Sequence, residues 1–428
     1  QAKTGVLACL GGFSAVLWLS ALLCRQTIDS SQGGESNFVS SVPANDSFLS
    51  LRHAERLATP RRQPTRPTAS RKPSVSYKAT SNIAMLPSTT LHQSWKYHVV
   101  LLLVFLGALL LISRLWRWLQ SRKACLLHRH FLITGGSSGI GRALARAVIR
   151  RGANVTLVAR NLGRLHEAKM ELREEVISPE QIIHTLSADL TEGETGEGAL
   201  ARGVAEAENM CGPVDYLVNC AGAAVSHRFD ETKISDFRHM MEVNYLSAVH
   251  TTRAVLPGMT QRGSGSVTFV SSIAGLMGVY GYTAYCPAKF ALVGLAQSLR
   301  MEVKHRGVHV MVAFPPDTDT PGFAEEERTK PTETKLICSA GGLWSADDVA
   351  NGLLQDLLEG NVTSTVGLDG FVIRTLCAGM MPPSSLLELV TQVASMGVLR
   401  IVGYIYLTRF YGIAARCAAK VKDGKKGN

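Results

Sequence analysis

Two side chains in the stretch AYCPAKF, Tyr285 and Lys289, stand four residues apart, which places them one turn apart on a helix. A phenol can protonate a developing alkoxide, but its pKa near ~10 is too high for ready proton exchange at neutral pH. A lysine ammonium one turn away would stabilise the phenolate and lower that pKa. Because this spacing is common by chance, the pair predicts acid–base catalysis only if the rest of the chain supplies a site around it.

A glycine-rich turn, TGGSSGIG, follows the apolar run HFLIT and opens a helical pattern. We expect Gly135 to permit the tight turn, Gly139 to let the backbone approach a pyrophosphate, and Gly141 to let the helix pack closely on the strand. The free N–H groups and the positive dipole at the helix start would hold the phosphates. A glycine turn without ligand is the alternative. To the predicted dinucleotide site we assign Gly135, Ser137, Ser138, Gly139 and Gly141.

The next predicted strand, NVTLVAR, ends in Arg160, where a site for a free ribose 2′-hydroxyl usually carries Asp or Glu. An arginine suits a 2′-phosphate instead, with help from Ser137 and Arg164, so we predict NADPH as the cofactor. A solvated surface arginine is the alternative. Asp189 closes the third strand and is expected to face the adenine. Asn219 ends the fourth, where it can brace the sheet and line the cofactor groove.

Two further polar residues complete a pattern. Ser272 ends the strand SVTFVSS, and Asn244 lies in the helical stretch EVNYLSAVH. Together with TGGSSGIG, NCAG and the Tyr–Lys pair, in this order and spacing, they resemble the short-chain dehydrogenase/reductase family over roughly 130–320. The resemblance implies a Rossmann-type doubly wound parallel sheet that binds a nicotinamide cofactor and reduces a carbonyl group.

The resemblance also implies a role for each residue around the reacting carbonyl. Tyr285 would donate the proton as general acid. Lys289 would lower the pKa of that phenol and hold the nicotinamide ribose, so that both side chains contact the cofactor. Ser272 would hydrogen-bond the substrate carbonyl, with Ser271 as an open alternative. Asn244 would hold a water that links Lys289 to solvent.

Three positions depart from the usual pattern of the family. Pro287 stands inside the Tyr–Lys motif where Ala is commoner, which a helix tolerates only in its first turn. Cys220 follows Asn219 at a position where members of the family often have a second Asn. The pair Pro315–Pro316 stands where Pro–Gly usually follows the last strand.

The segment PPDTDTPGF, the VARN and NCAGAAVS runs and the flanking apolar segments narrow the resemblance to one branch of the family, out to about residue 412. That branch reduces a long-chain keto-sphingoid base with NADPH at the endoplasmic-reticulum membrane, with its active site facing the cytosol. The resemblance implies the same substrate, cofactor and location here, with the lipid bilayer as a partner. It leaves the oligomeric state open, a homo-oligomer included.

Strand and helix patterns alternate from 130 to about 315, through NVTLVAR, DYLVNCAG, SVTFVSS and VHVMVAFP. Alternation of this kind predicts an α/β domain with a parallel sheet covered by helices on both faces. We place this catalytic domain at 128–385. The sequon at Asn154 suggests a secreted glycoprotein, but a glycan could not fit at the start of a core strand.

Apolar runs frame the domain. We expect a signal-like or first membrane segment at 1–24, a disordered basic linker at 25–96, and a transmembrane helix with a basic flank at 97–123. Residues 386–428 form a membrane-associated segment and a basic tail. Arg400 and Arg409 interrupt this segment, which leaves a surface helix pair, a hairpin and a second span as open alternatives.

Charge and cysteine usage exclude other classes. The net charge is +11, yet residues 131–385 hold 22 basic and 28 acidic side chains, so the positive charge lies on the flanks. This distribution favours a membrane protein over one that binds nucleic acid. The nine cysteines are scattered, which predicts free thiols and neither a zinc site nor a disulfide framework.

Two rival functions remain at this stage. One is a different membrane-bound lipid reductase, acting on a steroid ketone or on retinaldehyde, against which PPDTDTPGF argues. The other is a non-catalytic membrane scaffold that keeps a cofactor-binding fold, against which the intact Tyr–Lys pair argues.

Overall fold

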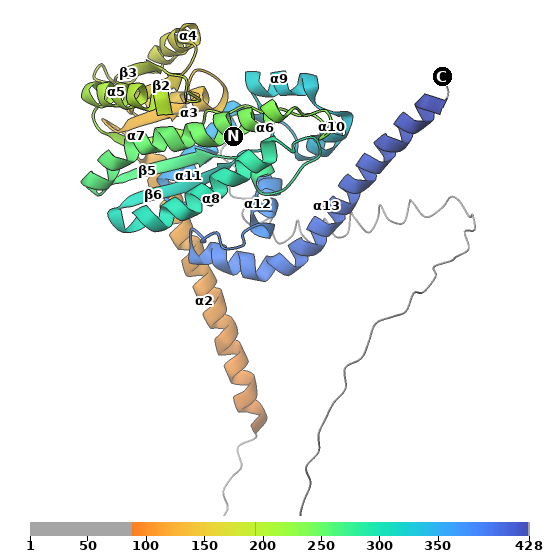
Figure 1. The fold of residues 1–428 in the computed structure, drawn as a ribbon. Coiled ribbons are helices and arrows are strands. Elements are labelled where there is room, and N and C mark those ends of the chain that lie inside the picture. The colour runs from red at the N-terminus through yellow and green to blue at the C-terminus, as the bar shows by residue number, and fades with distance from the viewer. Residues whose placement is uncertain (1–87, 193, 427–428) are drawn as a thin grey trace, which may run out of the picture. The chain divides into compact units, whose positions relative to one another are not determined.

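The structure is a computed structural model that describes residues 88–192 and 194–426 (Figure 1). The predictions for 1–24 and for 25–87 concern residues outside this part of the chain. Helix α2 (Ser88–Lys123) begins inside the range expected to be a disordered linker. The reason is visible in the sequence, because 88–96 contains neither proline nor glycine and so continues the helix of the apolar run.

Nine strands and twelve α-helices occur in the described residues. The strands are β1 (His130–Thr134), β2 (Asn154–Ala159), β3 (Ile183–Ser187), β4 (Val214–Asn219), β5 (Gly265–Val270), β6 (Val308–Phe314), β7 (Thr318–Asp319), β8 (Trp344–Ser345) and β9 (Thr363–Thr365). The helices after α2 are α3 (Gly139–Ile149), α4 (Leu162–Arg173), α5 (Glu194–Cys211), α6 (Ile234–Met241), α7 (Ser247–Arg262), α8 (Tyr285–Val303), α9 (Pro321–Thr329), α10 (Thr332–Cys338), α11 (Ala346–Leu358), α12 (Gly367–Leu376) and α13 (Leu386–Lys426). A π-helical turn, η1 (Glu242–Leu246), joins α6 to α7, and 3₁₀ turns occur at η2 (Ile273–Gly275), η3 (Lys304–Arg306) and η4 (Ser339–Gly341).

Seven strands form one parallel sheet in the order β3-β2-β1-β4-β5-β6-β9. The order reverses direction between β1 and β4, which is the point where open α/β sheets bind their ligands. The predicted Rossmann-type doubly wound sheet is therefore confirmed. Strand β9 and the small β7–β8 pair were not predicted, because strands of two or three residues carry no periodic signal.

The two faces of the sheet carry separate cores, as the alternation of side chains along a strand requires. Phe131 and Ile133 of β1 pack with buried residues of α3, α4 and α11. Leu132, between them, packs with buried residues of α5, α7 and α8 on the other face. Figure 1 shows these helices on the two sides of the strands.

The C-terminal segment is one continuous helix, α13, and therefore neither a helix pair nor a hairpin. Its stretch Leu386–Lys420 is long and apolar enough to cross a membrane, with a mean hydropathy of 1.5 over its most apolar window. It contacts α10 and α12 at least as far along as Gly403, and Glu388 pairs with Arg374 of α12 at 3.1 Å. Beyond these contacts the helix runs away from the domain (Figure 1).

Candidate active site

The glycine turn after β1 has the backbone that a dinucleotide site needs. Gly135 and Gly139 adopt φ values of +66° and +54°, where a side chain would be strained. A Cβ on Gly141 would lie 2.5 Å from the Gly135 carbonyl oxygen. Gly141 therefore closes the turn on itself, whereas we expected it to pack the helix on the strand. Ser138 precedes α3 in an extended conformation without a capping hydrogen bond, so its hydroxyl and the helix N–H groups are available to a phosphate.

Arg160 follows β2, and 64% of its side chain is exposed. Its closest acidic group is Asp189, with Nη1 3.9 Å from Oδ2, so the structure brings these two predicted residues together. The Thr191 N–H and hydroxyl both donate to the Asp189 carboxylate, at 3.0 and 2.7 Å. Burial opposes ionisation of Asp189, but these two bonds leave its pKa below the ordinary value. Arg164 lies in the first turn of α4, where its N–H donates to Asn161.

The end of β4 is fastened to β1 and to α7. Thr134 Oγ1 accepts the N–H groups of Cys220 and Ala221, at 2.9 and 3.0 Å. Asn219 donates through Nδ2 to Thr252 Oγ1 at 3.1 Å, a bond that ties the end of β4 to helix α7. Its Oδ1 is buried without a hydrogen-bond partner among the described residues, an acceptor left over at the edge where a cofactor would lie.

Tyr285, Lys289 and Ser272 meet at the C-terminal ends of the central strands. Tyr285 is the first residue of α8, and Pro287 therefore falls in the first turn, as the sequence required. The Ser272 hydroxyl hydrogen-bonds the Tyr285 phenol. Lys289 Nζ lies 5.7 Å from the centre of the Tyr285 ring and donates to the Val270 carbonyl at 3.0 Å.

The two adjacent serines have different environments. Ser271 is buried, and its hydroxyl donates to the Lys289 carbonyl at 2.9 Å. Ser272 caps η2, accepting the Ala274 N–H at 3.2 Å, and remains partly exposed beside Tyr285. Ser272 is therefore the serine that can reach a substrate, whereas Ser271 holds the start of α8 against β5.

Burial controls the ionisation of the catalytic pair. It raises the pKa of Tyr285 above its ordinary value, with a further contribution from the Glu326 carboxylate and an opposing one from the Ser272 hydroxyl. Burial also lowers the pKa of Lys289 to about 8. We expected Lys289 to lower the pKa of Tyr285; here the ammonium faces the Val270 carbonyl, and desolvation of the phenolate dominates. Tyr285 is thus held as the neutral phenol, which is the form a proton donor needs.

Asn244 lies in the π-helical turn η1, whereas the sequence predicted an ordinary helix. Its Nδ2 donates to the carbonyls of Ala223 and Met240, at 2.9 and 3.1 Å. A Cβ on Gly222 would lie 2.7 Å from Asn244 Oδ1 and 3.2 Å from Lys289 Nζ. Asn244 therefore fixes the segment after β4 against Lys289. Its assignment to a bound water stays a prediction.

An acidic network beside the tyrosine escaped the sequence analysis. The Tyr282 ring centre lies 5.4 Å from that of Tyr285, and its hydroxyl donates to Glu326. Lys330, whose side chain is fully buried, lies 3.0 Å from Glu326 and 3.6 Å from Asp317. Glu327, at 2.7 Å from Lys330 Nζ, makes three carboxylates around one ammonium. The only trace of this network in the sequence is the acidic run AEEER after PPDTDTPGF. The run shows no helical or strand periodicity that would have placed its side chains near Tyr285.

Comparisons with known proteins agree with this geometry. A profile of the short chain dehydrogenase family matches residues 129–331. A 3-dehydrosphinganine reductase from Danio rerio is 45% identical over 288 residues, which are 67% of this chain and 86% of that relative. A 3-ketodihydrosphingosine reductase from Bos taurus is 43% identical with the same coverage.

The solved structure of a levodione reductase matches 58% of this chain and 98% of its own, with a TM-score of 0.52. At 23% identity this likeness concerns the fold alone. The sequence profile and the curated relatives carry the family assignment. The chain belongs to the short-chain dehydrogenase family.

Proposed function

We propose that the protein reduces the C3 ketone of 3-ketodihydrosphingosine to the alcohol, with NADPH as the hydride donor. The observation that carries this proposal is the identity of 42–45% to reductases named for that substrate, over 86% of their length. The meeting of Ser272, Tyr285 and Lys289 at the end of the sheet supports it, because these side chains supply what ketone reduction needs from a protein.

The bound nicotinamide would supply the hydride, and the residues of the chain would manage the charge and the proton. Ser272 would hydrogen-bond the carbonyl oxygen, which gains negative charge as the ketone is reduced. The Tyr285 phenol would then donate its proton to that oxygen. The Lys289 ammonium would stabilise the phenolate left behind, a demand that arises only after the proton has moved.

The charge beside Tyr285 suits this substrate. A keto-sphingoid base carries an amino group on the carbon next to its ketone, and this amine is cationic at neutral pH. Asp317, Glu326 and Glu327 lie around the ammonium of Lys330, and Lys335 lies 3.9 Å from Glu327. Three carboxylates against two ammonium groups leave one negative charge in excess near the tyrosine. A steroid ketone or retinaldehyde is neutral, so the excess negative charge would not attract it.

The cofactor choice rests on Arg160, whose exposed guanidinium lies near the end of β2. A 2′-phosphate there would replace the long contact to Asp189 with a charge-assisted hydrogen bond. We expect Arg160→Asp to weaken NADPH far more than NADH, because the change removes an attraction and adds a repulsion. Equal loss of both cofactors would mean that Arg160 does not read the phosphate.

We place the enzyme at the endoplasmic-reticulum membrane with its catalytic domain in the cytosol. The support is the apolar stretch of α13, the uncharged run 99–113 of α2, and the basic residues that follow that run. Protease added outside sealed microsomes should then digest the catalytic domain without detergent. Protection that only detergent removes would reverse the topology.

The decisive experiment is an assay of membranes that contain the full chain, with 3-ketosphinganine and each nicotinamide cofactor. Formation of sphinganine with NADPH, well above that with NADH, is the expected result. A protein that binds NADPH but reduces neither this ketone nor a steroid or retinoid carbonyl would instead be a scaffold.

A further inference from the structure

A polar pocket of about 200 Å³ lies where α2, α11, α12 and α13 meet. None of its lining residues belongs to the catalytic or cofactor residues assigned above. Arg114 and Arg117 of α2 line one side, one helical turn apart. The start of α12 at Gly367, together with Phe371 and Arg374 of the same helix, lines another.

The lining of this pocket holds three arginines and three carboxylates, and one pair of them, Arg374 and Glu388, forms an ion pair. Within the described part of the chain, neither Arg114 nor Arg117 forms an ion pair. The acidic lining residues, by contrast, have partners. Glu388 is paired with Arg374, while Asp356 and Glu359 accept hydrogen bonds from Asn361 at 2.8 and 3.3 Å. Asn361 is neutral, so Asp356 and Glu359 also have no ion pair in the described residues. The guanidinium groups open to an anion are those of Arg114 and Arg117, on the α2 side of the pocket.

The start of α12 adds backbone N–H donors, which carry positive partial charge as the arginines carry full positive charge. Its N-cap residue, Val366, has no side chain that can accept the free N–H groups of the first turn. Gly367, which lines the pocket, begins this helix of ten residues with φ +77°. Arg374 Nε is buried with no hydrogen-bond partner among the described residues. Uncapped N–H groups and guanidinium groups together form a site for an anion.

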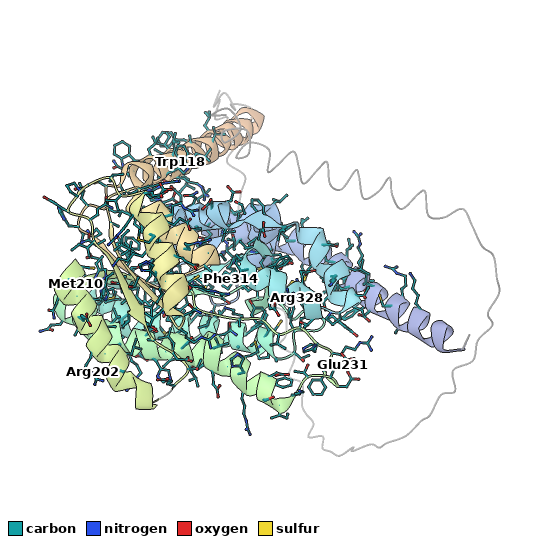
Figure 2. All side chains as sticks on the ribbon, turned by 90° about the horizontal axis from the view of Figure 1, so that it is seen from above. Trp118, Arg202, Met210, Glu231, Phe314 and Arg328 are labelled. Atoms are coloured by element: carbon teal, nitrogen blue, oxygen red, sulfur yellow. The ribbon has the colours of Figure 1, made fainter. Side chains whose placement is uncertain are left out.

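The position of the pocket along α2 indicates where the anion comes from. Arg114 follows directly on the uncharged run that ends at Ser113, so it would stand at the depth of the lipid headgroups if that run spans the bilayer. Leu115 and Trp116 beside it are exposed, at 54% and 64%. Trp118, at the end of α2 that meets the domain, is labelled in Figure 2.

We propose that this pocket binds the phosphate of an anionic phospholipid headgroup, held by Arg114, Arg117 and the N–H groups at the start of α12. Free phosphate shares this chemistry, but the run that precedes Arg114 places the site against lipid. A bound headgroup would join α2 to α12 and thereby to α13, the other helix able to enter the membrane. The proposal rests on the membrane attachment proposed above and is independent of the reaction that the enzyme catalyses.

The test uses the full-length protein in nanodiscs of phosphatidylcholine that also contain phosphatidylglycerol. After extraction into mild detergent, native mass spectrometry counts the phosphatidylglycerol that stays bound. Each basic residue near a lipid surface changes affinity by roughly five-fold, so Arg114→Gln with Arg117→Gln should lower retention by about 25-fold. Arg114→Lys with Arg117→Lys keeps the charge and should retain most of the lipid.

Arg409→Gln is the matched control, because Arg409 is an exposed basic residue of α13 that does not line the pocket. Nicotinamide cofactor binding, measured on every variant, reports that the catalytic domain has folded. Lipid retention that is unchanged in the double glutamine variant, or that falls equally in Arg409→Gln, overturns the proposal.

A second arm separates the two sources of phosphate. Inorganic phosphate is added to the detergent-extracted protein while lipid retention and thermal unfolding are followed. We expect that phosphate raises the unfolding temperature little and leaves the lipid in place. Displacement of phosphatidylglycerol by phosphate at physiological concentration would overturn the lipid assignment in favour of a soluble anion.

Discussion

At the scale of single residues, burial decides how the catalytic pair works. Tyr285 stays protonated because its phenolate would be poorly solvated, and the pKa of Lys289 falls to about 8 for the same reason. The two effects are complementary, since the tyrosine must begin as an acid and the lysine must be able to carry charge when the tyrosine gives up its proton.

We predict that Tyr285→Phe removes nearly all ketone reduction while cofactor binding persists. The change deletes one hydroxyl, and general acid catalysis contributes roughly 10²–10⁴-fold. Steady-state kinetics with 3-ketosphinganine, beside NADPH binding followed by fluorescence, measures both quantities. Turnover within a few-fold of the parent would remove Tyr285 from the mechanism.

The lysine predicts a pH dependence. The Lys289 ammonium predominates below its pKa of about 8 and is lost as the pH rises through that value, so reduction should weaken on the alkaline side. The profile of kcat/KM reports groups of the free enzyme. We therefore expect kcat/KM to decline above about pH 8. A profile that stays level to pH 10 would show that the charge on Lys289 is not needed.

At the scale of elements, short irregular pieces place the site residues. The π-helical turn η1 aims Asn244 at the segment after β4, and the start of α8 at Tyr285 accommodates Pro287. Each of these features lies next to a strand end, so the sheet sets the position and the irregular turn sets the direction of the side chain.

The glycine turn gives an element-scale prediction with an internal control. A Cβ at position 141 would meet the Gly135 carbonyl oxygen at 2.5 Å, so Gly141→Ala must move backbone. Such strain costs ~1–3 kcal/mol, which should weaken cofactor binding by about five- to 150-fold.

Gly294→Ala, inside α8 with nothing within 4 Å of the new Cβ, should leave cofactor binding unchanged and raise the unfolding temperature slightly. Calorimetric titration with NADPH compares the two variants. Equal affinity for Gly141→Ala and the parent would mean that the turn does not hold the cofactor.

At the scale of the whole molecule, one catalytic domain carries two long helices with exposed apolar side chains. Those of α2 include Phe105, Ile112 and Trp116, and those of α13 include Val393 and Tyr404, all of them at least 60% exposed. Surfaces of this extent on a folded chain mark contact with a membrane or a partner. Under the proposed membrane attachment, the enzyme would meet a substrate that stays in the bilayer, because pulling an alkyl chain into water costs ~0.8 kcal/mol per CH₂.

We predict that the membrane segments matter for long-chain substrates only. A variant that lacks residues 1–113 and everything after Gln392 loses most of both apolar stretches. It keeps the contact of α2 with Gln355 and the Arg374–Glu388 pair. Its activity on 3-ketosphinganine in membranes should fall much more than its activity on a short soluble ketone. Parallel loss of both activities would indicate that these segments only support the fold.

The sequence by itself determined the α/β class, the glycine turn, the family and the four residues proposed to carry the reaction. These follow from local chemistry, since a strand followed by TGGSSGIG, or a Tyr–Lys pair one helical turn apart, has the same meaning wherever the chain runs. The ends of β1, β4, β5 and β6 were likewise predicted to within two or three residues, because buried parallel strands read as continuous apolar runs.

Only the tertiary structure decided the burial and the contacts of each side chain, which can differ between two residues adjacent in the sequence. Ser271 and Ser272 are identical in sequence terms, yet one is buried against Lys289 and the other faces Tyr285. The acidic network around Lys330 and the arginine pocket at the base of α2 join segments far apart in the chain. Contacts and burial of this kind depend on which surfaces the fold brings together, and neither residue type nor periodicity specifies that.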